Sequence, residues 1–311
     1  MNHLKSMLIN GAIGDVYGAP IEMMPNEVIL NTYGLIDKYI ITDKIKDRMY
    51  SYTDDTQMTI ALINYFIDND DFSKNNIMKY WVKYFEPYRR YGKGTYDILL
   101  NYIMNNEITV RDAVTNGSLM RISPLTIVAL HKKYNDVELM EMIRLVHYPT
   151  HVNNEAHYTS FIFIKFLIFL DSIKNKENKQ KLILEYLSKI TIDNNFNINK
   201  NIKYILDNFN KPEYEILDTV IGLDGILCWE TLSCAILALI KNINKPDIIL
   251  SKAITYGGDC DTIGSIAGQM SGILFGEKSI KKNWLSNLEN KNYIQEISTK
   301  LIEFKKIGAK L

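Results

Sequence analysis

Apolar residues recur at intervals of three to four positions through most of this 311-residue chain. That spacing collects them on one face of an α-helix. The alternation of apolar and polar residues that is typical of strands is nearly absent, as are the glycine turns that join strands into hairpins. The spacing therefore predicts an all-α protein. Apolar residues make up 47% of the chain, which is ordinary for a globular protein with a sizeable core.

Two of the predicted helices carry several glycines on one side. The first is predicted over residues 4–17, and its glycines are at positions 11, 14 and 18. The second is predicted over residues 266–275, and its glycines are at positions 264, 268 and 272. A glycine inside a helix costs about 1 kcal/mol relative to alanine. Three on one side indicate that another backbone approaches closely, so we expect the two helices to pack against each other.

No linker rich in Gly, Ser or Pro divides the chain, and no internal repeat is present. We therefore expect a single domain over residues 1–311, in which residues 175–212 form two peripheral amphipathic helices. Residues 18–52 contain Pro20 and Pro25 in a stretch of mixed polarity, which predicts a long loop. Long loops inside compact domains are often functional.

Charge and cysteine content limit the partners and the compartment. Lys+Arg and Asp+Glu both number 36, so nothing predicts a basic surface for nucleic acid. The three cysteines form no CxxC pair, which is typical of a reducing compartment. No apolar signal segment opens the chain, and the apolar run 160–170 is too short to span a bilayer. We expect a cytoplasmic monomer without nucleic-acid or membrane partners, and a buried helix over 160–170.

The segment from Gly257 to Ser265 places Asp259, Asp261 and Thr262 within four residues, with glycines on both sides. Oxygen ligands at such close spacing suit a hard cation, Mg²⁺, Mn²⁺ or Ca²⁺. The alternative is helix capping, because Asp and Thr are favoured in the first turn of a helix. Two acids together with flanking glycines favour the metal site.

A second acidic cluster, Thr53-Asp54-Asp55-Thr56, precedes a helix predicted over residues 58–67. By itself this cluster could equally be a cap. It repeats the chemistry of the first cluster, and adjacent carboxylates repel each other unless cations are present. Two such clusters can surround a pair of divalent cations, as in two-metal hydrolases.

Four further features are weak when each is taken alone. Glu22 lies on the predicted loop, and a single acid there is typical of a solvated surface. The turns Gly92-Lys93-Gly94 and Asn116-Gly117-Ser118 could present backbone N–H groups to a phosphate, although glycine turns between helices are common. His151 alone is typical of a capping or core histidine.

Taken together and in order, these motifs resemble those of the ADP-ribosylglycohydrolases. The resemblance extends over most of the chain, through Gly11–Asp15, Ser51–Thr56, Tyr91–Gly94, Asn116–Pro124, Thr150–Ala156 and Gly257–Gly276. The pairing of the sequence TDDT with GGDCDTIG is its most specific part. Residues 175–212 contribute nothing to the resemblance.

The resemblance implies a compact all-α fold around a binuclear Mg²⁺ or Mn²⁺ centre. The implied metal ligands are Thr53, Asp54, Asp55, Asp259, Asp261 and Thr262. The implied substrate-binding residues are Asp15, Gly92, Gly94, Gly117, Ser118 and His151. Glu22 matches the acidic residue of the family's loop over the substrate, and it or Asp55 would transfer a proton as general acid or base.

The implied activity is hydrolysis of the glycosidic bond between ADP-ribose and an acceptor, which is a protein side chain or a small conjugate. Arginine, serine and small-molecule linkages all remain open. One alternative is a non-catalytic ADP-ribose-binding or structural protein, as in the lens crystallins related to this family. A second alternative is a two-metal phosphohydrolase that cleaves a nucleotide-type substrate at the pyrophosphate.

Overall fold

The computed structural model describes residues 2–43, 47–69, 72–190 and 195–303, and α-helix dominates them. The all-α prediction is confirmed. In these residues the α-helices are α1 (His3–Gly18), α2 (Asn26–Tyr33), α3 (Asp54–Asp68), α4 (Lys74–Lys83), α5 (Lys93–Asn105), α6 (Pro124–Lys132), α7 (Asp136–His147), α8 (Asn154–Ile173), α9 (Lys179–Ile190), α10 (Asn197–Asp207), α11 (Glu213–Val220), α12 (Cys228–Lys241), α13 (Ile249–Thr255), α14 (Cys260–Phe275), α15 (Lys282–Ser286) and α16 (Lys291–Glu303). The shorter elements are the 3₁₀ helices η1 (Ala19–Ile21), η2 (Asn116–Ser118), η3 (Pro246–Ile248) and η4 (Gly276–Ser279), and the strands β1 (Met24–Pro25) and β2 (Gly257–Gly258).

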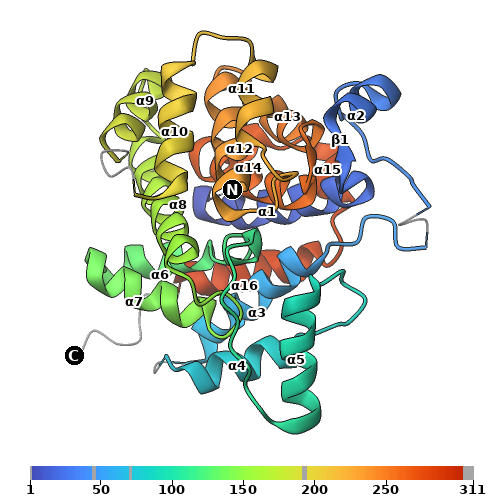
Figure 1. Ribbon diagram of the computed structural model, residues 1–311, viewed down its shortest axis with the longest axis vertical. Coiled ribbons are helices and arrows are strands. Elements are labelled where there is room, and N and C mark those ends of the chain that lie inside the picture. Colours follow the sequence, from blue (N-terminus) through green and yellow to red (C-terminus); the bar gives the residue numbers. More distant parts are fainter. Residues whose placement is uncertain (1, 44–46, 70–71, 191–194, 304–311) are drawn as a thin grey trace.

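Helices α1 and α14 pack side by side at the centre of the molecule (Figure 1). A Cβ atom at Gly14 would overlap the carbonyl group of Gly264, and one at Gly268 would overlap the carbonyl oxygen of Asn10. Gly272 lies against Ser6 in the same way. The predicted contact between the two glycine faces is therefore confirmed.

This order of contacts makes α1 and α14 antiparallel. The C-terminal end of α1, with Gly18, consequently lies against the backbone of Asp261 at the start of α14. The remaining helices enclose this pair, with α3–α7 and α16 below α1 and α9–α13 above it in the view of Figure 1. The central pair thus places Asp15 beside the Asp259–Thr262 segment.

Two predictions about secondary structure were wrong: the long loop over residues 18–52 and the start of the second glycine-bearing helix. Residues 18–52 contain η1, β1 and α2, and β1 pairs antiparallel with β2 through Met24 opposite Gly258 and Pro25 opposite Gly257. A pair of two-residue strands is too short to show the alternation by which strands are predicted. Helix α14 begins at Cys260, before the predicted start at residue 266. Gly264 weakens a helix locally, and here the close packing on Gly14 offsets that cost.

The described part of residues 175–212 contains α9 and α10, which lie together at one side of the molecule (Figure 1). Each buries one apolar face against α8 or α12. The fully buried apolar side chains of these two helices are Ile183, Leu187, Ile198, Ile202 and Ile205. Neither helix supplies a residue to the cavity described below.

Helix α8 is the one helix in the described residues that is long and apolar enough to cross a membrane by length and composition. However, 61% of its most apolar window is buried inside the protein, where it packs on α7, α12 and α14. Most side chains from Ser160 to Leu170 are buried, which is the buried helix predicted there. This burial is typical of a core helix.

Candidate metal centre and substrate cavity

Two glycines in the left-handed region of backbone conformation precede α14. Gly257 has a φ of 79° and Gly258 a φ of 62°, values that glycine adopts far more readily than other residues. A side chain at Gly258 would also overlap the backbone of Asp224, which accepts a hydrogen bond from Asp259 N at 2.7 Å. This geometry places Asp259 at the N-cap of α14 and Asp261 in its first turn.

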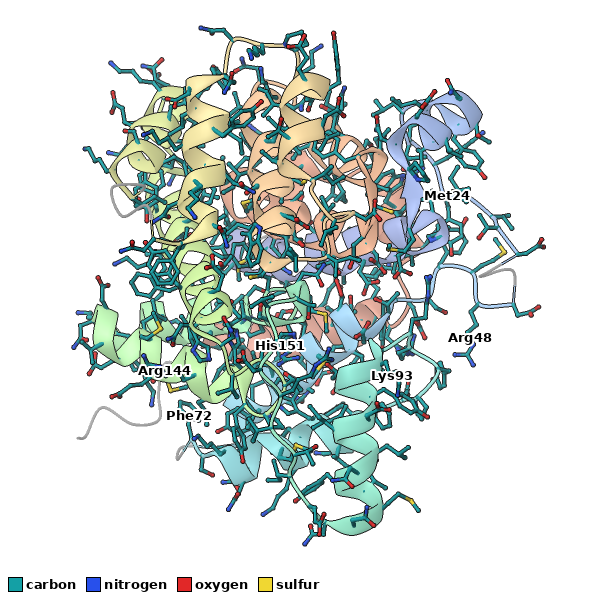
Figure 2. The ribbon with its side chains drawn as sticks, viewed as in Figure 1. Met24, Arg48, Phe72, Lys93, Arg144 and His151 are labelled. Atoms are coloured by element: carbon teal, nitrogen blue, oxygen red, sulfur yellow. The ribbon has the colours of Figure 1, made fainter. Side chains whose placement is uncertain are left out.

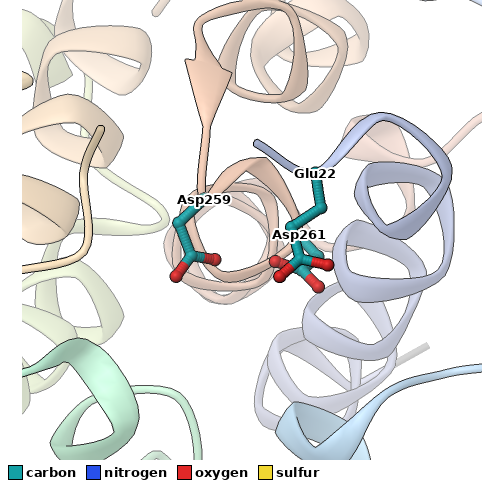
Figure 3. A group of neighbouring side chains, drawn as sticks. All are labelled: Glu22, Asp259 and Asp261. Atoms are coloured by element: carbon teal, nitrogen blue, oxygen red, sulfur yellow. The ribbon is translucent and has the colours of Figure 1, made fainter. Parts of the chain in front are cut away.

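The strand pairing brings Glu22 to the same place. Met23 N donates to the carbonyl oxygen of Gly258 at 2.7 Å, so the residue before it lies over the start of α14. Carboxylate oxygens of Glu22, Asp259 and Asp261 lie within 4.8 Å of one another (Figure 3). Burial, followed by the nearby charges of Glu22 and Asp259, raises the pKa of Asp261 well above its usual range. A cation at this point would offset the repulsion between the three carboxylates.

Asp15 holds the second acidic cluster in place through hydrogen bonds to its backbone. Its carboxylate accepts hydrogen bonds from Thr53 N at 2.9 Å, from Thr56 N at 3.0 Å and from Thr56 Oγ1 at 2.6 Å. Burial raises the pKa of Asp15 although these bonds act to lower it. Asp15 is fully buried and does not line the cavity. It therefore positions the turn at residues 53–56, and no surface of it is open to a substrate.

The turn at residues 53–56 aims Asp54 and Asp55 toward α14. Thr53 caps α3 with its hydroxyl, which accepts from Asp55 N at 3.4 Å. Thr262 Oγ1 donates to Asp55 Oδ2 at 3.2 Å, so the two acidic clusters are in direct contact. The pKa of Asp55 is raised well above its usual range by burial and then by Asp15 and Asp54.

The side chains present fit a hard cation. Asp55 Oδ1 is buried and has no hydrogen-bond partner among the described residues, and a buried acceptor of this kind is costly unless something binds it. The neighbouring donor atoms from Glu22, Asp259 and Asp261 are all carboxylate oxygens. Oxygen-only donor sets of this kind are typical of Mg²⁺, Mn²⁺ and Ca²⁺ sites.

Both acidic clusters open into one cavity of about 340 Å³, which is within the range of small-molecule sites. The predicted site residues that line it are Glu22, Asp54, Asp55, Gly92, Gly94, Gly117, His151, Asp259, Asp261 and Thr262. Thr53, Ser118 and Asp15 lie behind the wall. Ser118 is fully buried, and its hydroxyl donates to the carbonyl oxygen of Thr115 at 3.0 Å.

His151 supports the wall at Gly117. A Cβ on Gly117 would lie 2.7 Å from His151 Cε1, so a larger residue there would displace the ring. The ring nitrogens of His151 contact Thr115 Oγ1 at 2.9 Å and Thr150 Oγ1 at 2.8 Å. Burial and the nearby arginines Arg121 and Arg111 hold the pKa of His151 well below its usual range. The ring is therefore neutral at pH 7.

Comparison with known proteins decides the family. Residues 1–307 match the ADP-ribosylglycohydrolase family. The chain belongs to this family. It is similar to the ADP-ribosylarginine hydrolase Tri1 of Serratia proteamaculans, with 21% identity over 97% of this chain and 79% of Tri1. It is also similar to the ADP-ribosylhydrolase ARH3 of Gallus gallus, with 22% identity over 81% of this chain and 78% of ARH3.

A solved structure shares the fold. The ADP-ribosylglycohydrolase-related protein complex superposes with a TM-score of 0.69 and 20% sequence identity, covering 98% of each chain. The helical architecture described above is thus an ADP-ribosylglycohydrolase fold.

Sequence reasoning missed three residues of this ADP-ribosylglycohydrolase site. Asn116 Nδ2 donates to Asp259 Oδ2 at 2.8 Å. The Arg90 guanidinium forms an ion pair with Glu22, and Arg90 Nη1 donates to Ala19 O at 2.7 Å. Arg111 lines the cavity. Arg90 lies two residues before the turn Gly92-Lys93-Gly94, and Asn116 is the first residue of the turn Asn116-Gly117-Ser118, so both turns offered a signal, whereas nothing near Arg111 did.

The Arg90–Glu22 pair also changes the interpretation of Glu22. The sequence predicted this acid on an irregular loop. In the structure the Glu22 side chain is held by Arg90, and the next residue is held by the backbone of β2. Glu22 is thus placed by the fold itself.

Proposed function

We propose that this protein is a metal-dependent hydrolase that cleaves the glycosidic bond between ADP-ribose and an acceptor, either a protein side chain or a small conjugate. The observation that carries the proposal is the meeting of the two acidic clusters in one cavity, with Thr262 bonded to Asp55. Membership of the ADP-ribosylglycohydrolase family supports the same conclusion. Relatives named as ADP-ribosylhydrolases support the substrate class.

We propose that two divalent cations, Mg²⁺ or Mn²⁺, are the cofactors. The residues that would hold them are Thr53, Asp54, Asp55, Asp259, Asp261 and Thr262. When bound, such cations supply positive charge that orients substrate hydroxyls and makes a nearby water more acidic. Thr53 would contribute least by its side chain, because its hydroxyl already caps α3.

The reaction breaks the bond between C1″ of the distal ribose and the acceptor atom. Water supplies a hydroxyl group to C1″ and a proton to the acceptor, which gives free ADP-ribose and the unmodified acceptor. Asp55 is placed to take the proton from water, because its buried Oδ1 is unpartnered and the other oxygen is held by Thr262. Glu22, held over the site by Arg90, is placed to give or take the second proton.

The glycine turns would receive the rest of the ligand. Gly92, Gly94, Gly117 and His151 line the same cavity as the carboxylate cluster, and the His151 ring lies against Gly117. Neutral His151 can accept or donate one hydrogen bond without adding charge. Ser118 and Asp15 would act indirectly, through the backbone segments that they hold.

The test is product analysis on arginine- and serine-ADP-ribosylated peptides and small ADP-ribose conjugates, each with Mg²⁺, Mn²⁺ or EDTA. We expect free ADP-ribose, identified by mass, only where a divalent cation is present. AMP with ribose-5-phosphate would instead identify a phosphohydrolase. Tight binding of ADP-ribose without turnover of any conjugate would identify a non-catalytic protein.

We further propose that the protein acts as a cytoplasmic monomer without nucleic acid. The cysteines Cys228, Cys234 and Cys260 are free and buried, which is typical of a reducing compartment. Light scattering on the purified protein tests the oligomeric state, and a mass near twice 36.0 kDa would contradict it.

A further inference from the structure

The wall of the cavity contains positively charged side chains as well as carboxylates. These charged side chains differ in whether they form an ion pair within the protein. Arg90 pairs with Glu22. Lys93 is largely solvated and pairs with Asp97 at 2.6 Å, one turn along α5. Arg111 also lines the cavity, and within the residues that the structure describes its guanidinium has no hydrogen bond or ion pair. Arg111 is thus the one described cation of the cavity wall that has no protein partner.

The backbone of Arg111 is fixed although its charged group is unpaired. Arg111 N donates to the carbonyl oxygen of Pro149 at 2.9 Å, and Val152 N donates to the carbonyl oxygen of Arg111 at 3.0 Å. These bonds tie Arg111 to the segment that carries His151. Its neighbour Asp112 is turned to another partner, since Asn153 Nδ2 donates to Asp112 Oδ1 at 2.6 Å.

Gly94 receives the Arg111 side chain. A Cβ at Gly94 would overlap the guanidinium group, and the three heavy atoms nearest to that position all belong to Arg111. Gly94 lies in the first turn of α5, where a glycine has no helical advantage over alanine. Its missing side chain instead leaves room for the guanidinium at the cavity wall.

We infer that Arg111 binds the diphosphate of ADP-ribose and so determines specificity for a substrate that carries phosphate. This inference rests on the proposed function. The diphosphate of ADP-ribose carries two negative charges, and Arg111 is the described cation of the cavity wall whose charge is left free to neutralise them. A guanidinium presents several N–H donors in a fixed plane, a geometry that matches phosphate oxygens.

The experiment measures binding and turnover separately. In Arg111→Gln we expect the Kd for ADP-ribose, measured by calorimetry, and the KM for a conjugate to rise by about tenfold or more, because a hydrogen bond to a charged group is lost. We expect kcat to change by less than about threefold, since the reacting C1″ is held at the carboxylate cluster. Raising the salt concentration should weaken binding less in the variant than in the wild type.

Two matched variants control for charge alone. Lys181→Gln removes a cation from α9 that is already paired with Glu185, and Arg144→Gln removes an arginine from α7, which lies well away from Lys93 at the cavity rim (Figure 2). We expect both variants to bind ADP-ribose within about twofold of the wild type, because exposed charges contribute little. A loss in these variants as large as in Arg111→Gln would overturn the assignment.

Gly94→Ala provides a second route to the same result. The added methyl group displaces the guanidinium, so we expect weaker ADP-ribose binding in the wild-type background and no further loss in Arg111→Gln. If Arg111→Gln bound ADP-ribose with wild-type affinity, the inference about Arg111 would be overturned. The proposed function would still stand if that variant released ADP-ribose from its conjugates. A wild-type protein that neither binds ADP-ribose nor hydrolyses its conjugates would overturn both.

Discussion

Gly14 of α1 lies directly against the backbone of Gly264 in α14, where a Cβ would stand 2.6 Å from the next backbone nitrogen, that of Ser265. Helix backbone cannot move aside as the end of a flexible side chain can. We expect Gly14→Ala to lower the free energy of unfolding by about 1–3 kcal/mol, the usual cost of overpacking. Urea denaturation measures this change.

The control for this prediction is Gly92→Ala, where no heavy atom lies within 4 Å of the added Cβ. We expect it to cost less than about 1 kcal/mol, since its main effect is at the N-cap of α5. Equal losses in Gly14→Ala and Gly92→Ala would contradict the importance of the close helix contact.

Asp15 holds the turn at residues 53–56, so its substitution is expected to affect stability and activity together. In Asp15→Asn one acceptor oxygen becomes an amide that faces the N–H groups of Thr53 and Thr56. We expect a loss of about 1–3 kcal/mol, the cost of unsatisfied buried donors. We also expect a lower kcat, measured on the best conjugate, because the turn would no longer hold Asp54 and Asp55 toward α14. Thr56→Ser, which keeps the hydroxyl donor, should retain most of both properties.

Asp261→Asn tests the carboxylate cluster under the proposed function. We expect kcat to fall about 100-fold or more, as when an electrostatic group of an active site is removed. The exposed Asp218→Asn on α11 is the matched control and should have wild-type activity. Circular dichroism checks that both variants fold. Undiminished turnover in a folded Asp261→Asn protein would exclude a catalytic role for this cluster.

Removal of divalent cations is expected to destabilise the protein. A ligand at 100 times its Kd adds about 2.7 kcal/mol to the free energy of unfolding, and here it also offsets repulsion between Glu22, Asp259 and Asp261. We therefore expect thermal melting to occur at a lower temperature in EDTA than in Mn²⁺ or Mg²⁺. The difference should shrink in Asp261→Asn. Identical melting with and without cations would count against the metal centre.

His157 is expected to make stability depend on pH. Its ring stacks on that of His147 with centroids 5.2 Å apart, and neither of its nitrogens has a hydrogen-bond partner among the described residues. Burial, then the charge of Arg144, lowers the pKa of His157 to about 4.

The unfolded chain takes up this proton near pH 6.5 and the folded protein only near pH 4. The stabilisation by neutral His157 is therefore complete above pH 6.5 and is lost as pH falls toward 4. The loss is about 1.4 kcal/mol per pH unit for one histidine. Urea titrations between pH 7 and pH 5 measure the slope. His157→Asn should show a smaller slope, and the difference between the two proteins separates His157 from the carboxylates of the site.

The sequence by itself determined the helical class, the glycine faces of α1 and α14, and the grouping of Asp54 with Asp55 and of Asp259 with Asp261. These features depend on the spacing of residues along the chain. Helix periodicity and the clustering of charged residues can both be recognised in the sequence. The family motifs followed from the same local patterns, because each occupies a few consecutive residues.

Only the tertiary structure decided how these pieces meet. The pairing of β1 with β2 places Glu22 at the start of α14. Strands of two residues are too short to show the alternation of apolar and polar residues by which strands are predicted. Asp15 was expected to touch substrate, yet its contacts with Thr53 and Thr56 place it behind the site. The Arg90–Glu22 pair and the place of Arg111 on Gly94 join residues from separate segments. Such contacts depend on the packing of whole helices, which no local spacing encodes.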